Sequence, residues 1–292
     1  MNSMRVPDYH IDEFFGQGFT LVEAFLSADE LAVARGALWS IYPTPEDYFA
    51  DAEAYAHLQR HGFSGNYKFP FGHFELNQLV VHPDLVDVAQ RILHTPDVRL
   101  YKGEVWGKYG GGFDYAQHHH RDFGNHTLVV PRADGYRRDL LAYIYLCDVD
   151  EGNGSTAIVP LEHTRDISLG ISRAAPGDLV EHEIRLNGRA GSLVLYSTDV
   201  FHRGTALLDP LSSRFMILAD YRRADAPWYQ MTAFGLSGNR PEMNEFVTQA
   251  TPQQRTLLDI PAPGHEYWNA QTIADIALRY PGIDMEPYRL AG

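Results

Sequence analysis

The sequence predicts a mainly β fold with flanking helices, with an antiparallel sandwich or jelly roll at the centre of the chain. Short apolar or alternating segments recur between Val98 and Tyr221, and residues typical of turns separate them. Such segments at this spacing are typical of antiparallel sandwiches and barrels. The predicted strands are Val98–Lys108, Thr127–Val130, Leu140–Cys147, Ser155–Val159, Leu179–Ile184, Ser192–Tyr196 and Arg214–Tyr221.

Helices are predicted on both sides of this β region. Ser27-Ala-Asp-Glu30 matches a capping box, and apolar residues follow it at helical spacing. A second helix is predicted over Pro83–Leu93, because proline suits the first position of a helix. Helical patterns return over Pro252–Leu258 and Ala270–Tyr280. We therefore expect N-terminal helices over about 27–94, a β core over about 98–221 and a C-terminal helical extension over about 222–292.

Composition and charge limit the classes of protein that this chain can belong to. No repeat or flexible linker divides the 292 residues, so we predict a single domain over 1–292. The formal net charge of −14 argues against nucleic acid or an anionic membrane as a partner. Met1–Tyr9 shows no secretory signal, and no apolar run approaches the ~20 residues that span a bilayer. The single cysteine, Cys147, fits a reducing cytoplasm, and no pattern indicates a protein partner.

A metal site is predicted from the segment His120-Arg121-Asp122. Alternate residues of an extended chain point to the same side, so the imidazole and the carboxylate can converge on one ion. His202 follows the predicted strand that ends at Tyr196 and would supply a third ligand. Two histidines and one carboxylate on one face of an octahedron are typical of non-haem iron(II) oxygenases. His118 and His119 leave the choice of the first histidine open, although only His120 has an aspartate two positions later.

An anion site is predicted beside the metal site. Arg214 lies 12 positions after His202 and begins a predicted strand, with the turn Asp209-Pro210 between them. The antiparallel return of the chain would place its guanidinium near the metal, where it could bind a carboxylate through two parallel hydrogen bonds. Arg203 is the alternative, but next to His202 its side chain should point to the other side of the chain.

These motifs together resemble the phytanoyl-CoA dioxygenase family of 2-oxoglutarate-dependent oxygenases. The matching stretches are Gln117–Phe123, residues 153–164 and Ala190–Gly204, and the resemblance covers roughly Phe14 to Tyr221. It implies a double-stranded β-helix, the jelly roll shared with cupins, and a need for iron(II), 2-oxoglutarate and O₂. It further implies hydroxylation of an unactivated C–H bond in a small molecule of acyl, amino-acid or natural-product type.

The resemblance also assigns roles to single residues. His120, Asp122 and His202 would be the catalytic metal ligands, and Arg214 would anchor the far carboxylate of 2-oxoglutarate. Tyr143 matches the position of an aromatic residue that flanks the co-substrate, with ordinary core packing as its alternative role.

Further contacts are expected from the strand before the H-x-D segment. Lys102, Glu104, Trp106 and Lys108 share one face of it. The family lines its pocket from this strand, so we expect Lys102 and Trp106 to contact the co-substrate or the substrate.

Other functions remain compatible with the same residues. Desaturation, epimerisation or ring formation would use the same ligands, whereas a halogenase would need a small residue in place of Asp122. A cupin-like metalloenzyme without 2-oxoglutarate would keep the three ligands and would not need Arg214. A β-sandwich binding module with incidental histidines is the third alternative.

Overall fold

The computed structural model describes residues 5–59, 66–68, 71, 73–96, 98–111, 114–134, 139–223, 225, 239, 244, 247–248, 252, 255 and 260–290. Its strands are β1 (Phe19–Val22), β2 (Asn66–Lys68), β3 (Val98–Tyr109), β4 (Leu140–Tyr145), β5 (Ala157–Ile158), β6 (Ile184–Arg185), β7 (Leu193–Ser197), β8 (His202–Arg203) and β9 (Ser213–Arg223). Its helices are α1 (Asp8–Gln17), α2 (Ala28–Leu38), α3 (Pro45–Ala50), α4 (Phe74–Leu79), α5 (Pro83–Leu93), α6 (Phe123–His126), α9 (Ala270–Arg279) and α10 (Glu286–Leu290). Short 3₁₀ helices are η1 (Ala56–Gln59), η2 (Leu161–His163) and η3 (Val180–His182).

The strands form two antiparallel sheets. The larger has the order β1-β7-β4-β9-β3-β2, and the smaller has the order β6-β5-β8. Ile158 of β5 packs in one apolar cluster with Leu141, Val194 and Leu218 of the larger sheet. The two sheets therefore pack face to face, which confirms a mainly β protein and is consistent with a jelly roll.

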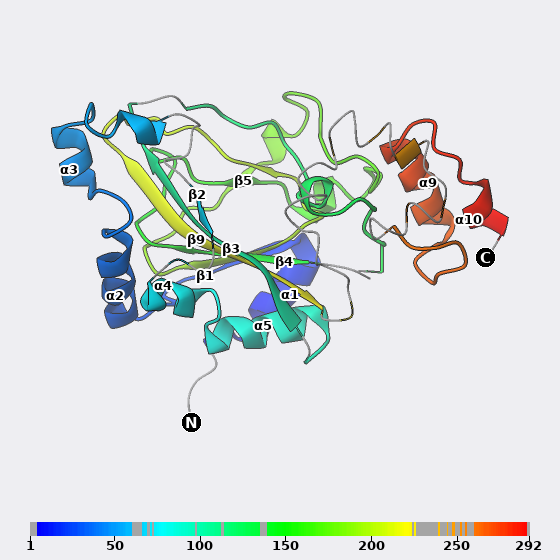
Figure 1. The fold of residues 1–292 in the computed structure, drawn as a ribbon, viewed down its shortest axis with the longest axis horizontal. Helices are drawn as coiled ribbons and strands as arrows, with labels where there is room; N and C mark the ends of the chain where they lie inside the picture. The colour runs from blue at the N-terminus through cyan, green and yellow to red at the C-terminus, as the bar shows by residue number, and fades with distance from the viewer. Residues whose placement is uncertain are drawn as a thin grey trace.

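The two faces of the larger sheet bury different partners. Ala142 and Ile144 of β4 and Ile217 of β9 point toward α2, α4 and α5 and form the largest apolar cluster with them. These helices lie along one side of the sheet (Figure 1). The residues that alternate with these along β4 and β9, such as Tyr143 and Leu218, point toward the smaller sheet. This alternation follows from the period of two along a strand, and it sends every second side chain into the interior between the sheets.

The helices with clear start signals lie where the sequence predicts them. Ser27 caps α2 in a capping box with Glu30, and α5 begins at Pro83. Asn269 caps α9, which lies at the C-terminal end of the molecule (Figure 1). The predicted helix Pro252–Leu258 lies outside the described residues apart from positions 252 and 255. No helix in the described part of the chain has the length and apolar character needed to cross a bilayer.

Two predicted strands were wrong, and three of the described strands were not predicted. Thr127–Val130 is irregular, because its carbonyl groups accept hydrogen bonds from side chains of the C-terminal region, including Arg279. Three of the six residues of Leu179–Ile184 form the 3₁₀ helix η3, with bonds from residue i to i−3 after the turn at Gly177, and only Ile184 belongs to a strand, β6. Of the unpredicted strands, β1 and β2 lie within the N-terminal part of the chain, and the two-residue strand β8 contains His202.

Candidate metal centre

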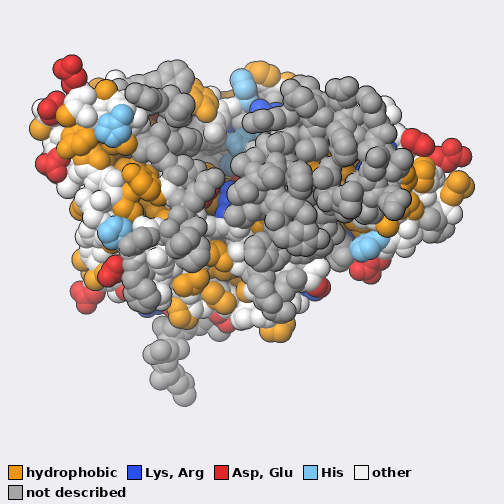
Figure 2. Space-filling model, viewed as in Figure 1, with side chains coloured by type: hydrophobic (Ala, Val, Ile, Leu, Met, Phe, Trp, Pro, Cys, Tyr) orange, Lys and Arg blue, Asp and Glu red, His pale blue; other side chains and the backbone are white. Residues whose placement is uncertain are grey.

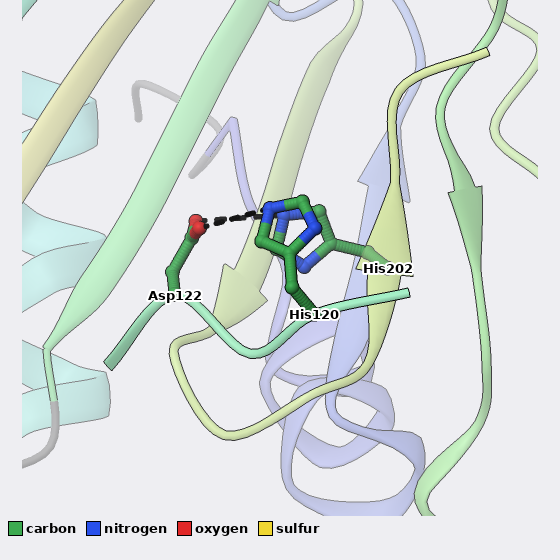
Figure 3. Close-up of side chains that lie close together, drawn as sticks. All are labelled: His120, Asp122 and His202. Atoms are coloured by element: carbon green, nitrogen blue, oxygen red, sulfur yellow. Dashed lines mark ion pairs between the residues drawn. The ribbon is translucent and has the colours of Figure 1, made fainter. Parts of the chain in front are cut away.

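His120, Asp122 and His202 converge in the interior. His120 and His202 form an isolated antiparallel bridge, in which each backbone N–H donates to the other residue's carbonyl at 2.9 and 3.0 Å. Their side chains consequently lie together, with ring centroids 4.5 Å apart. Asp122 points at both rings, with its two carboxylate oxygens 3.5 Å from Nε2 of His120 and of His202 (Figure 3). The three donor atoms lie within 4.8 Å of one another.

The hydrogen bonds of the two imidazoles determine which nitrogen is available to a metal. Nδ1 of His120 lies 2.9 Å from the carbonyl of His118, and Nδ1 of His202 lies 3.2 Å from the carbonyl of Val200. A carbonyl oxygen only accepts, so each Nδ1 carries the proton and each Nε2 keeps a free lone pair. This is the tautomer and orientation that metal-binding histidines have.

The charge states at this site also suit a metal. Burial lowers the pKa of His202 to about 4, so this imidazole is neutral near pH 7. Burial alone would raise the pKa of Asp122, but the nearby His202 and His120 rings outweigh it, and the pKa lies well below its usual range. Burial lowers the pKa of His120, but the contact with Asp122 outweighs it and leaves this pKa above its usual value, so a bound metal would displace a proton there. Two imidazole nitrogens and one carboxylate are a donor set that fits iron(II).

Tyr196 contacts two of the three residues, and the sequence reasoning did not single it out. Its hydroxyl donates a 2.9 Å hydrogen bond to Oδ2 of Asp122. Its ring meets the His202 ring edge-on at a centroid distance of 4.8 Å. Only the alternation along the predicted strand Ser192–Tyr196, with Val194 and Tyr196 on one face, could have indicated it.

The neighbouring histidine and arginine alternatives point elsewhere. Nε2 of His119 lies 2.9 Å from the carboxylate of Glu183. Arg203 binds the same carboxylate through two hydrogen bonds of 2.5 and 3.0 Å. His118 is exposed. None of the three side chains belongs to the group that surrounds Asp122.

Arg214 is buried in the interior. It lies opposite Lys108 in the pairing of β9 with β3, and its guanidinium donates to the carbonyl of Gly154. Asp114 pairs with Lys108. Among the described residues, no carboxylate lies within ion-pair distance of Arg214. A buried guanidinium without a counter-ion is costly, so this place suits the carboxylate of a ligand.

Tyr143 is within electrostatic range of both Arg214 and Asp122. Its ring packs 5.8 Å from that of Tyr196. Burial raises its pKa to about 12, so the phenol stays protonated. The hydroxyl is buried and makes no well-formed hydrogen bond within the described chain. It is therefore both part of the core and a polar atom to which a ligand could bond.

Lys102 and Trp106 point into the interior, as the strand pattern predicts, and belong to a polar group there. Lys102 Nζ lies 3.1 Å from Nε2 of His126, whose Nδ1 lies 3.0 Å from Asp220. The Trp106 indole donates to Glu104 at 3.1 Å, and Lys102 lies 3.9 Å from the same carboxylate.

The same polar group continues to Asp139, which pairs with Arg222 at 2.6 Å. Burial raises the pKa of Asp139 to about 6 and that of Asp220 to about 7. His126, Asp139 and Asp220 could also be grouped as metal donors, but the ammonium of Lys102 already contacts His126 and the guanidinium of Arg222 already pairs with Asp139. We therefore interpret this group as a polar wall and not as a second metal centre.

The candidate site is partly open to solvent. Figure 2 shows histidine and Lys or Arg side chains close together in a hollow near the middle of the face that it draws. The side chains of His120, Asp122, Lys102 and Glu104 keep a partial exposure of 17, 12, 19 and 12%. The candidate site is thus enclosed but reachable.

Solved structures with a similar fold come from 2-oxoglutarate enzymes. The carbocyclase SnoK from nogalamycin biosynthesis is 20% identical, with a TM-score of 0.56 over 75% of this chain and 85% of SnoK. EctD from S. alaskensis is 17% identical, with a TM-score of 0.57 over 79% of this chain and 82% of EctD. EvdO2 from Micromonospora carbonacea var. aurantiaca, solved with 2-oxoglutarate, is 13% identical, with a TM-score of 0.57 over 75% and 91%. At these identities the similarity establishes the fold.

The sequence itself establishes the family. Among curated proteins, none matches the chain significantly. The family model for phytanoyl-CoA dioxygenase (PhyH) matches residues 14–208, which is most of the chain and includes all three converging residues. The chain therefore belongs to the phytanoyl-CoA dioxygenase family and is a 2-oxoglutarate-dependent non-haem iron oxygenase.

Proposed function

We propose that His120, Asp122 and His202 hold the iron and that Arg214 binds the far carboxylate of 2-oxoglutarate, so that the enzyme hydroxylates an unactivated C–H bond of a small molecule. The observation that carries this proposal is the convergence of two free Nε2 atoms and one carboxylate within 4.8 Å. When bound, iron and 2-oxoglutarate would supply the activation of O₂ that this chemistry requires.

The protein's own contribution would be to bind, orient and exclude water. Arg214 would exchange its contact with the carbonyl of Gly154 for a paired contact with the co-substrate, which would neutralise a buried charge. The Tyr143 hydroxyl, which makes no well-formed hydrogen bond to the described residues, would bond to the co-substrate. The apolar wall around Leu218 and Ile158 would keep water from the reacting groups.

The polar wall favours a substrate with polar groups over an unbroken hydrocarbon chain. Lys102 and Glu104 keep partial exposure on the interior face of β3. An aliphatic chain placed against them would leave both charges poorly solvated, which is unfavourable. We therefore favour amino-acid and natural-product substrates over acyl substrates. A cytoplasmic location also remains part of the proposal.

The fold alone does not distinguish hydroxylation from the other reactions that this site could catalyse. Neighbours of similar fold include the carbocyclase SnoK and the epimerase SnoN. The carboxylate of Asp122 argues against halogenation, because it occupies the place that a halide would need. A cupin-like metalloenzyme without 2-oxoglutarate would not need Arg214 for its activity.

Anaerobic titration with iron(II) and 2-oxoglutarate tests the proposal. The wild-type protein should develop the weak visible charge-transfer band of the ternary complex, and Asp122→Ala should lose it because a ligand is missing. Asp166→Ala, which removes an exposed carboxylate, is the control and should behave as wild type. A normal band in Asp122→Ala would refute the ligand assignment.

The role of Arg214 needs its own pair of variants. Arg214→Met should weaken 2-oxoglutarate binding by a factor of 30 or more, on the order of the 2–5 kcal/mol that loss of a buried charge pair costs. Arg203→Met should leave it unchanged, because Arg203 binds Glu183. Unchanged 2-oxoglutarate affinity in Arg214→Met would favour the cupin-like alternative.

A further inference from the structure

We propose that Tyr196 is a positioning residue for the metal: its hydroxyl holds Oδ2 of Asp122 and so keeps the carboxylate turned toward the two histidines. This inference rests on the proposed function, since it requires a metal at the three converging residues. It concerns a different property of the site, namely how well the ligands are oriented before the metal arrives.

Asp122 has few other means of being oriented. It precedes α6, but its side chain does not cap that helix. Within the described chain, the two imidazoles at 3.5 Å and the Tyr196 hydroxyl at 2.9 Å are the only polar groups in contact with its carboxylate. The imidazoles would themselves turn to the metal, so Tyr196 is the one contact that metal binding would leave in place.

Tyr196 is itself held rigidly. It lies on β7 inside the larger sheet, paired with Phe19 of β1 on one side and with Leu141 of β4 on the other. Its side chain is 4% exposed and packs against Tyr143 and His202. A phenol fixed in a sheet is a more precise support than one on a loop.

The contact also joins the two layers of the fold. His202 belongs to β8 of the smaller sheet, and His120 is bridged to it, whereas Tyr196 belongs to the larger sheet. The Tyr196–Asp122 hydrogen bond therefore fixes the position of the carboxylate relative to both sheets. A donor bound to one oxygen occupies a lone pair there and favours coordination through a single oxygen. Groups that orient metal ligands in this way are typically worth 10- to 100-fold in metal affinity.

The test compares two tyrosines that differ in what their hydroxyls contact. Tyr145 is as buried as Tyr196 and lies on the same interior face, but its hydroxyl donates to the carbonyl of Leu186 at 2.6 Å. We expect Tyr196→Phe to weaken binding of cobalt(II) alone by about 10-fold or more and to alter its visible spectrum. We expect Tyr145→Phe to bind cobalt(II) as wild type does, although it should lose thermal stability.

A second pair of variants restores or withholds the donor without leaving a gap. Para-aminophenylalanine at position 196 keeps an N–H donor and should restore wild-type affinity. Para-fluorophenylalanine fills nearly the same volume, cannot donate, and should bind cobalt(II) as weakly as Tyr196→Phe. This pair also decides the question if Tyr196→Phe does not fold.

The outcomes distinguish this inference from the proposed function. Equal cobalt(II) affinity and spectra in wild type, Tyr196→Phe and the para-fluoro variant would overturn the role of Tyr196 alone. Equal weakening in Tyr145→Phe would overturn it too, because any buried hydroxyl would then suffice. Failure of the wild type to bind, or normal binding by Asp122→Ala, would overturn the metal site itself.

Discussion

Asp220, in the polar wall, is a single residue whose ionisation affects the stability of the fold. It is fully buried between Lys102, Arg222 and His126, with Asp122 and Glu104 also within electrostatic range. One carboxylate oxygen accepts from His126, and the other has no hydrogen-bond partner among the described residues. Burial is the main reason why its pKa rises to about 7.

This raised pKa predicts a pH dependence of stability. An aspartate in the unfolded chain ionises near pH 3.9, so between that value and about 7 the folded protein holds a proton that the unfolded chain has lost. The contribution of Asp220 to the free energy of unfolding therefore falls as pH rises through this window and levels off above it. Asp220→Asn, which keeps an acceptor for His126, should remove this trend.

Urea denaturation of the metal-free protein from pH 6 to pH 8 measures the effect and avoids the pI of about 5.4. The free energy of unfolding of wild type minus that of Asp220→Asn should decrease up to about pH 7. The exposed variant Asp166→Asn should show no such trend. A constant difference for Asp220→Asn would mean that the carboxylate ionises in the folded protein as it does in water.

The turn Asp209–Ser212 before β9 shows how one element positions another. Gly110, directly after β3, lies so close to this turn that a Cβ atom there would come within 2.5 Å of the Asp209 carbonyl and 2.8 Å of the Pro210 carbonyl. Its N–H donates to Ser212 at 2.7 Å. Backbone atoms cannot move aside as a side chain can, so this approach requires glycine.

Gly110→Ala should therefore displace the turn and the start of β9, where Arg214 lies. We expect a loss of about 1–3 kcal/mol in the free energy of unfolding, together with weaker 2-oxoglutarate binding. Gly36→Ala is the matched control, because Gly36 lies in α2 with no atom near the new methyl group. It should stabilise the protein by about 0.5–1 kcal/mol. Equal stability of both variants in urea would show that position 110 does not require glycine.

The elements that could be predicted are those with local signals. Capping residues and proline determine α2, α5 and α9, and alternation or apolar runs determine β3, β4, β7 and β9. Thr127–Val130 failed because its apolar residues pack against the C-terminal region, a contact that no local pattern records. The short strand β1 depends in the same way on a partner far along the chain.

The same distinction holds for the site. The spacing of His120, Asp122 and His202 is visible in the sequence because the ligand types and the extended segment are local features. The contacts of Tyr196 with Asp122 and of Lys102 with His126 depend on which strands are neighbours. Those pairings are set by the packing of the whole chain, so the residues that support the ligands could not be identified beforehand.

For the molecule as a whole, ligand binding should appear as added stability. A ligand that binds only the folded state stabilises it by about 2.7 kcal/mol at 100 times its Kd. Iron(II) with 2-oxoglutarate, added anaerobically, should therefore raise the thermal midpoint by several degrees, and a chelator should reverse the shift. Asp122→Ala should show no metal-dependent shift. An identical shift in that variant would place the metal elsewhere.

The pairing of β1 with β7 has a consequence for biosynthesis. Val22 and Leu193 are neighbours in the sheet although 171 positions separate them in the chain. At ~5–20 residues per second, a ribosome would need roughly 10 to 35 seconds to deliver the partner strand after the first one emerges. Helix α1 contacts β1 and adjoins it in sequence, so it can shield the apolar side chains of the nascent strand during that interval.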